Sequence, residues 1–329
     1  MQSPIVSVCI PAYNGERFIK YAIASVLTQT FTDWELIICD DCSNDNTAKI
    51  VDSFSDSRIR FYINPKNLGI SANFNRCIEF SKGNYIYIFA QDDVMCSTNL
   101  EKKVKLLNEN PKVGMVYSNA YKIDEKGEIV CKYWAGVHDE DFVQDGSSYL
   151  KSSLFRNNAI CCPTVMVRKE CYNKVGGYDL RLTFTLDFEM WMRIALHYNI
   201  AYLSEPLIYY RRHSDNYTHK HTKNLGGIKE DYLARKIVIE KNLEKFENVN
   251  SLFKEIKRCI SNISLDRAIN YYNTDFNMLA LKHLYFAFKI YPPIFKKWLF
   301  KRLLIKILFG TKGVNLFRKL KIILNKISI

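Results

Sequence analysis

Short apolar strands alternate with helical segments from the start of the chain to about residue 118. The pattern predicts strands over 6–10, 35–39, 58–63, 85–90 and 113–118, with helices over 18–27, 47–54, 70–81 and 99–108 between them. Strands and helices that alternate at this short spacing build a parallel sheet with helices on both faces. We therefore predict an α/β fold with a Rossmann-like, mostly parallel sheet.

The rest of the chain follows a different pattern. We expect an irregular polar segment over 120–161, a strand over 163–168, a helix over 187–197 and a strand over 206–211, followed by helices alone from about Lys223. The chain therefore divides into an α/β domain, residues 1–222, and a helical C-terminal region, residues 223–329.

The net charge of +13 is concentrated at the end of the chain. Asp275 is the last acidic residue, and twelve of the 47 Lys and Arg residues follow it. The residues up to Asp275 carry a net charge of +1, so a near-neutral body leads into a strongly basic tail.

The first residues and the cysteines bear on the compartment. Met1 to Pro4 lead directly into an apolar strand, so we expect no signal peptide. In a chain without an export signal, we expect the ten cysteines to be reduced thiols. The two acidic residues between Cys39 and Cys42 oppose a reactive thiolate, so we expect no redox role there. These expectations place the protein in the cytoplasm.

Polar side chains follow three of the predicted strands. Pro11, Ala12 and Tyr13 follow the first, Asp40 and Asp41 the second, and Gln91, Asp92 and Asp93 the fourth. Ligands of such sheets bind beyond the carboxyl ends of the strands. Mg²⁺ and Mn²⁺ prefer oxygen ligands and are held by one or two carboxylates plus substrate phosphates, which suits Asp92 and Asp93. The alternative is that these two aspartates only cap the helix that follows.

The usual glycine-rich nucleotide loops are missing. Neither G-x-G-x-x-G nor G-x-x-x-x-G-K-[ST] follows the first strand. The sequence therefore argues against a dinucleotide-dependent dehydrogenase and against a P-loop NTPase.

Several segments in a fixed order resemble family 2 glycosyltransferases of the GT-A fold. They are IPAYNGERFI, SVLTQTFTDWELIICDDCSNDNT, NPKNLGISANFN and GNYIYIFAQDD, and the resemblance extends from Pro4 to about His213. It implies a GT-A domain that transfers a sugar from a nucleotide-diphospho-sugar with inversion at the anomeric carbon, assisted by Mg²⁺ or Mn²⁺.

The resemblance also implies roles for individual residues. Pro11, Ala12 and Tyr13, with Glu16 nearby, would contact the base and ribose, Asp41 would accept a hydrogen bond from the base, Asp92 would lie against the ribose or sugar, and Asp93 would hold the metal. His213 would assist at the metal or diphosphate, and the alternative is a surface histidine. Mn²⁺ suits a neutral imidazole better than Mg²⁺ does.

The catalytic base of the family is the aspartate of a Glu-Asp pair at the start of a helix. Asp187 matches this aspartate, whereas Leu186 departs from the glutamate. Such a carboxylate takes the proton of the acceptor hydroxyl as it attacks. Glu189 is the second candidate for the base. The alternative for Asp187 is a purely structural role, in which its negative charge stabilises the N-terminus of the helix.

A second departure affects the nucleotide. Asn73-Phe74-Asn75 stands where many relatives carry Ala-Arg-Asn, so Asn73 or Asn75 would replace the missing arginine by hydrogen bonding. This pattern is familiar among surface-polysaccharide enzymes, including rhamnosyltransferases. We expect UDP in the donor, with dTDP as the alternative.

The basic tail predicts a membrane-surface helix. Over 314–327 most apolar residues fall on one side of a helical wheel and the basic residues on the other. Such a helix lies flat on an anionic membrane, and no stretch reaches the roughly 18 apolar residues of a spanning helix. The alternatives are packing on the catalytic domain and nucleic-acid binding, and we expect no nucleic-acid partner.

Together these features predict a metal-assisted glycosyltransferase that extends a lipid-linked surface glycan, such as an O-antigen or capsule, at the inner face of the cell membrane. Two alternatives remain open. One is a sugar-nucleotide pyrophosphorylase, which would need a Gly-rich first loop with Arg or Lys that this chain lacks. The other is a non-enzymatic membrane-associated scaffold.

Overall fold

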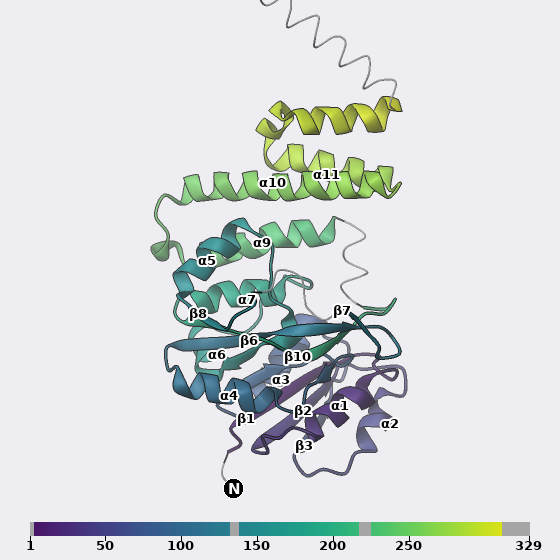
Figure 1. Cartoon of the computed structure of the whole chain (residues 1–329), viewed down its shortest axis with the longest axis vertical. Helices are drawn as coiled ribbons and strands as arrows, with labels where there is room; N and C mark the ends of the chain where they lie inside the picture. Colours follow the sequence, from purple (N-terminus) through teal and green to yellow (C-terminus); the bar gives the residue numbers. More distant parts are fainter. Residues whose placement is uncertain (1–2, 132–137, 217–224, 311–329) are drawn as a thin grey trace, which may run out of the picture. The chain divides into compact units, whose positions relative to one another are not determined.

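The computed structural model describes residues 3–131, 138–216 and 225–310, and the chain forms two compact units (Figure 1). Unit 1 comprises Met1–Ser153 and Asn157–His219, and unit 2 comprises Leu154–Arg156 and Lys220–Ile329. The predicted boundary between residues 222 and 223 lies outside the described residues.

The elements of the α/β part follow the predicted alternation. In chain order they are β1 (Val6–Ala12), α1 (Ile19–Leu27), β2 (Trp34–Asp40), α2 (Thr47–Asp52), β3 (Ile59–Ile63), α3 (Ile70–Phe80), β4 (Tyr85–Ile88), β5 (Val94–Met95), α4 (Asn99–Glu109), β6 (Val113–Ile123), β7 (Ile129–Cys131), β8 (Phe142–Gln144), α5 (Gly146–Phe155), the 3₁₀ turn η1 (Cys162–Thr164), β9 (Met166–Arg168), α6 (Lys169–Val175), α7 (Leu186–Ala195) and β10 (Asn199–Arg211).

The strands of the described part of unit 1 form one sheet in the order β3-β2-β1-β4-β9-β6-β10-β5. The first four are parallel to one another, and β6 and β10 are also a parallel pair. β9 is antiparallel to both its neighbours, β5 lies antiparallel at the edge, and β7 and β8 pair with β6 and β10. The prediction of a mostly parallel sheet flanked by helices is confirmed.

Different helices pack on the two faces of the sheet, because successive side chains of a strand point to opposite faces. Val8 and Ile10 share a core with Ile23 of α1, and helices α2 and α4 contribute to the same core. Cys9 points to the other face, where its thiol lies 3.7 Å from the Cys77 carbonyl of α3. Helices on both faces thus leave the carboxyl ends of the strands for loops.

Strand β1 runs two residues further than predicted, so Pro11 and Ala12 belong to the strand and not to the loop after it. The Asp41 amide donates to the Ala12 carbonyl, so Ala12 faces β2. Pro11 therefore faces β4, the other neighbour of β1. The pairing of β1 with β4 ends at Cys9, so the backbone of Pro11 has no ladder partner on that side. A proline, which has no N–H, is tolerated where no ladder bond is needed.

Strands β6 and β10 are also longer than predicted. They pair in parallel over most of their lengths, with register shifts around Pro206. Polar residues such as Ser118 and Asn119 interrupt the apolar pattern of β6, and Asn119 bonds the next backbone amide through its own side chain. The segment 120–161 is less irregular than expected, since it contains β7, β8 and α5.

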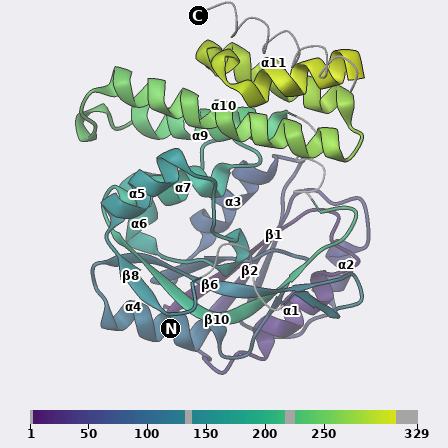
Figure 2. The same cartoon turned by 45° about the horizontal axis from the view of Figure 1, so that its top comes forward.

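The described part of unit 2 is helical, as predicted. Its elements are α9 (Gly226–Glu240), η2 (Leu243–Lys245), α10 (Val249–Asn273), α11 (Asn277–Ile290), η3 (Pro292–Lys296) and a helix over 298–310. Helices α10 and α11 lie side by side (Figures 1 and 2). Ser261 and Ser264 of α10 donate to the carbonyls of Ala287 and His283.

Unit 2 has its own apolar core, which includes Leu265, Leu284, Ile294, Phe300 and Leu303. Part of the basic tail therefore packs inside the unit. No helix of the described residues is long and apolar enough to cross a bilayer. The amphipathic segment 314–327 lies outside the described residues.

Lys103 of α4 is fully buried in unit 1. Its ammonium donates to the Tyr87 hydroxyl at 3.0 Å, Asn99 Oδ1 at 2.7 Å and the Thr164 carbonyl at 2.6 Å. Burial holds the pKa of this lysine well below its usual range. The three bonds link α4, β4 and the η1 turn.

Replacing Lys103 with alanine should lower the free energy of unfolding by about 2–4 kcal/mol, because three buried groups lose their donor. The matched control is Lys105→Ala, on the exposed side of the same helix, which should change stability by less than about 0.5 kcal/mol. Urea unfolding measures both, and equal effects would contradict a structural role for Lys103.

Candidate functional site

The loop after β1 is fixed to the loop after β2 by hydrogen bonds. Asn14 N–H donates to Ser43 Oγ and Gly15 N–H to Thr47 Oγ1, both at 2.8 Å. Glu16 Oε2 accepts from the backbone and side-chain nitrogens of Asn46. Glu16, predicted to contact the nucleotide, therefore has a role inside the chain, and its contact with a nucleotide stays a prediction.

Gln91 fixes the first loop from the other side. Its side chain accepts from the Tyr13 amide at 2.9 Å and donates to the Tyr13 carbonyl at 3.0 Å. A Cβ on Gly15 would lie 2.4 Å from Gln91 Oε1, so any other residue there would displace the Gln91 side chain from this contact. The Tyr13 side chain itself is 45% exposed and presents a ring at the edge of the sheet.

Asp41 is buried and binds the segment before α3. Its carboxylate accepts from Asn64 Nδ2 and from the amides of Leu68 and Gly69, at 2.8 to 2.9 Å. A carboxylate has about four acceptor sites, so one remains for a base.

Asn73 is buried beside Asp41. Its Nδ2 donates to the Cys39 carbonyl at 2.8 Å, and its Oδ1 accepts from Asn64. Both ends of this amide are used within the chain, which differs from the expected donor to the nucleotide. Asn75 likewise bonds the amide and carbonyl of Tyr178. A nucleotide contact for Asn73 stays a prediction that this geometry does not favour.

Asp92 and His213 lie together. His213 Nε2 is 2.9 Å from Asp92 Oδ2, which also accepts from Asn216 Nδ2 at 2.9 Å. The imidazole packs on Phe18, with ring centroids 4.8 Å apart. His213 is thus held at the loop that contains Asp92 and Asp93 (the acidic loop), although 121 residues separate it from Asp92 in the sequence.

Asp93 is fully buried behind this pair. Its Oδ1 accepts from the Arg211 amide at 2.8 Å, whereas its Oδ2 has no partner within the described residues. Burial, and then the charge of Asp92, raise the pKa of Asp93 well above its ordinary value, against the lowering effect of Arg211. Of the two aspartates, Asp92 is the more accessible, with a side chain that is 22% exposed.

These groups suit a divalent cation in part. Within the described residues no group of three or more His, Cys, Asp or Glu side chains is arranged to bind an ion. However, Asp93 Oδ2 and His213 Nδ1 are buried acceptor-type atoms without a partner in the described structure. Such a donor set fits Mg²⁺ or Mn²⁺ only if substrate phosphates and water supply the remaining ligands.

Asp187 lies in the first turn of α7. Its Oδ1 accepts from the Phe188 amide at 2.7 Å and its Oδ2 from Asn158 Nδ2 at 3.4 Å. Burial raises the pKa of Asp187 to about 6, against these hydrogen bonds, which lower it. A carboxyl with this pKa is a competent general base near neutral pH.

The η1 region relates Asp187 to the acidic loop. Burial, and then the charges of Asp93 and of Asp187 among others, raise the pKa of the Cys161 thiol. Both carboxylates therefore lie within electrostatic range of one turn.

Glu189, the second candidate base, is fully buried and paired with Arg193 at 2.7 and 2.8 Å. Arg193 also donates to the carbonyls of Val175 and Gly177. The pair therefore holds the turn before α7, and Glu189 is not available to an acceptor hydroxyl.

Arg17 is a residue that the sequence analysis missed. It pairs with Glu125 at 2.9 Å and with Asp215 at 3.1 Å, and so joins three loops around His213. The pairs are about half exposed, so their contribution to stability is small. Separations of 108 and 198 residues leave no local signal.

Comparisons with known proteins agree with this architecture. The family model described as "Glycosyl transferase family 2" matches residues 7–176. An uncharacterized glycosyltransferase of Methanocaldococcus jannaschii, MJ1057, is 31% identical over 66% of this chain and 74% of its own length. WfgD of Escherichia coli, a UDP-Glc:alpha-D-GlcNAc-diphosphoundecaprenol beta-1,3-glucosyltransferase, is 30% identical over 61% of this chain and 74% of its own length.

The fold has counterparts among solved structures. S. aureus TarS 1-349 in complex with UDP-GlcNAc aligns with a TM-score of 0.60 and 15% identity, over 94% of this chain and 88% of that one. At this identity the likeness concerns the fold. The family match sets aside the pyrophosphorylase and scaffold alternatives. This chain therefore belongs to glycosyl transferase family 2 and is a glycosyltransferase.

Proposed function

We propose that this enzyme transfers a sugar, with inversion, from a nucleotide-diphospho-sugar to a hydroxyl of a lipid-linked glycan, with Mg²⁺ or Mn²⁺ and with Asp187 as the base. The observation that carries the proposal is the pairing of His213 with Asp92 next to the buried Asp93, where Asp93 Oδ2 and His213 Nδ1 have no partner within the described residues.

UDP is the nucleotide that we propose, with dTDP as the alternative. The TarS structures contain UDP and UDP-GlcNAc, and the name of WfgD gives UDP-Glc as its donor. In this chain the exposed Tyr13 ring, which follows Pro11 and Ala12 at the end of β1, would stack on the base. The remaining acceptor site of Asp41 would bind an N–H of the base.

Asp93 and His213 would hold the metal, with Asp92 beside them toward the sugar nucleotide. The ion, when bound, supplies positive charge at the leaving diphosphate. The partly exposed carboxylate next to His213 belongs to Asp92, so this residue is a further candidate ligand.

Asp187 would accept the proton of the acceptor hydroxyl. The hydroxyl oxygen forms the new bond to the anomeric carbon, the bond to the diphosphate oxygen breaks, and the electron pair leaves with the diphosphate. Asn158 and the Phe188 amide orient the carboxylate. Burial at the helix start keeps its basicity high.

A lipid-linked acceptor implies work at a membrane. WfgD is named for an acceptor joined to diphosphoundecaprenol. The basic residues after Asp275 and the exposed Trp298, Leu308 and Phe309 suit an anionic bilayer surface. We therefore propose a peripheral location on the inner face of the cell membrane.

Chelation should abolish donor binding, and Mn²⁺ should restore it. Asp93→Asn and His213→Ala should each weaken Mn²⁺-dependent binding of a UDP-sugar about tenfold or more, because each removes a ligand. Calorimetry across a nucleotide-sugar panel measures this, with circular dichroism to confirm folding. Asp52→Asn, on the exposed side of α2, is the control. Metal-independent binding by the wild-type enzyme would refute the metal role, and a stronger loss in Asp92→Asn would move it to Asp92.

The transfer rate should depend on pH through Asp187. The base works only when ionised, so kcat/KM should fall about tenfold per pH unit below a pKa of about 6 and level off above it. Asp187→Asn should keep donor binding and lose about 10²–10⁴ of the transfer rate. Asp139→Asn, in an exposed loop, is the control. Normal transfer by Asp187→Asn would show that another group is the base.

The full chain should float with anionic vesicles and not with neutral ones, and salt should weaken the binding. Truncation would remove core residues such as Phe300 and Leu303, so substitutions are the sharper test. Leu308→Ser with Phe309→Ser should reduce flotation. Ile129→Ser with Val130→Ser, equally exposed apolar residues of unit 1, should not. Equal flotation of both double variants would argue against this surface.

A further inference from the structure

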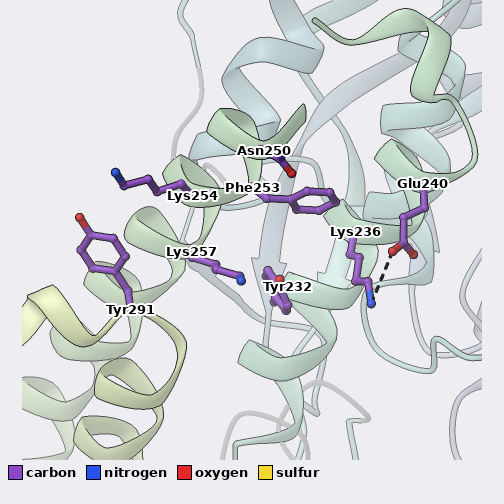
Figure 3. A pocket seen from close by; sticks show the side chains of 8 residues that line it. All are labelled: Tyr232, Lys236, Glu240, Asn250, Phe253, Lys254, Lys257 and Tyr291. Atoms are coloured by element: carbon purple, nitrogen blue, oxygen red, sulfur yellow. Dashed lines mark ion pairs between the residues drawn. The ribbon is translucent and has the colours of Figure 1, made fainter. Parts of the chain in front are cut away.

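Unit 2 contains a pocket that the proposed catalytic site does not use. It has a volume of about 430 Å³ and lies between α9, α10 and the end of α11 (Figure 3). Its lining residues are Tyr232, Lys236, Glu240, Asn250, Phe253, Lys254, Lys257 and Tyr291. The volume is in the range of pockets that bind small ligands, so the shape admits a mono- or disaccharide with its substituents.

The charge in this pocket is unbalanced. Lys236 pairs with Glu240 at 3.5 Å, the only acidic residue in the lining. Lys254 and Lys257, one turn apart on α10, have no ion pair or side-chain hydrogen bond within the described residues, and Lys257 is half-buried. In Figure 3 the Lys257 side chain extends toward Tyr232, whereas the exposed Lys254 side chain extends in the opposite direction. A partly desolvated ammonium without a counter-ion favours an anionic ligand.

The aromatic side chains add a second requirement. Tyr232, Phe253 and Tyr291 come from three segments and line the same pocket. Aromatic rings pack on the apolar C–H faces of sugar rings, and tyrosine hydroxyls and Asn250 can bond sugar hydroxyls. A pocket lined by lysines alone would bind any anion. A pocket that combines lysines with aromatic rings suits a ligand with both a phosphate and a sugar ring.

We propose that this pocket binds a phosphorylated saccharide, with Lys257 on the phosphate, Lys254 adding positive charge from the exposed side, and the aromatic residues on the sugar. The ligand has two sources: the sugar-diphosphate head of a lipid-linked saccharide other than the reacting acceptor, and a free sugar phosphate. In both cases the site is separate from the residues assigned to the donor, the metal and the base.

Direct binding to the full chain tests the site without turnover. The probes are N-acetylglucosamine 1-phosphate, inorganic phosphate and neutral N-acetylglucosamine, measured by calorimetry with EDTA present. The sugar phosphate should bind more tightly than either part. Lys254→Ala with Lys257→Ala should weaken it about tenfold or more, because the charge-assisted contact of Lys257 and the nearby charge of Lys254 are lost, and Phe253→Ala should weaken the sugar phosphate but not inorganic phosphate.

The matched control is Lys229→Ala with Lys282→Ala, exposed lysines outside the pocket that give the same change in net charge. It should leave binding within about twofold, since only long-range charge is lost. Equal weakening in both double variants, or a wild-type chain that binds none of the probes, would overturn the proposal. Unchanged thermal unfolding of the variants shows that they fold.

Calorimetry with a short-chain lipid-diphospho-N-acetylglucosamine and EDTA then separates the two sources. If the pocket holds a lipid-linked saccharide, this probe should bind the wild-type chain and should bind the Lys254→Ala with Lys257→Ala variant about tenfold more weakly. If the pocket takes a free sugar phosphate, only N-acetylglucosamine 1-phosphate should depend on these lysines. If the metal and base predictions fail but the probes still bind, the proposed function is contradicted and the proposal for this pocket is not.

Discussion

Arg211 at the end of β10 holds the acidic loop of the site in place. Its amide donates to Asp93 Oδ1, and its guanidinium donates to the Asp92 carbonyl and to the carbonyls of Asp124 and Glu125. The side chain is almost wholly buried. A charged group with so many partners is costly to displace, so β4, β6 and β10 are locked to one another where the proposed metal ligands lie.

The other loops are fixed in the same way, by polar groups that satisfy one another. Gln91 holds both backbone groups of Tyr13, Ser43 and Thr47 accept from the first loop, and Asp41 collects three donors before α3. Few of these groups would need to reorganise when a substrate binds. Such preorganisation is the usual way in which a rigid sheet presents chemistry on loops.

The proposed base is supported from a different direction. The Glu189–Arg193 pair binds the carbonyls of the turn before α7, and Asn75 of α3 bonds Tyr178 in that turn. A Cβ on Gly177 would lie 2.5 Å from Asn75 Oδ1, so any other residue there would displace the Asn75 side chain that bonds this turn. Asp187 therefore sits on a helix start whose position depends on contacts from two other helices, and its raised pKa follows from that burial.

The sequence by itself determined the alternating elements, the mostly parallel sheet, the helical second unit and the family, because apolar periodicity and ordered motifs are local. It also placed Asp92, Asp93 and Asp187 among the candidates. It did not reveal that β9 lies antiparallel between β4 and β6, because a three-residue strand has too little pattern of its own. Only the tertiary structure decided that Asp93 is buried and Asp92 meets His213, that Asn73 and Glu189 serve the scaffold, and that a basic pocket forms in unit 2. Each of these depends on which distant segments share a surface, and burial and pairing are set there and not by neighbours in the chain.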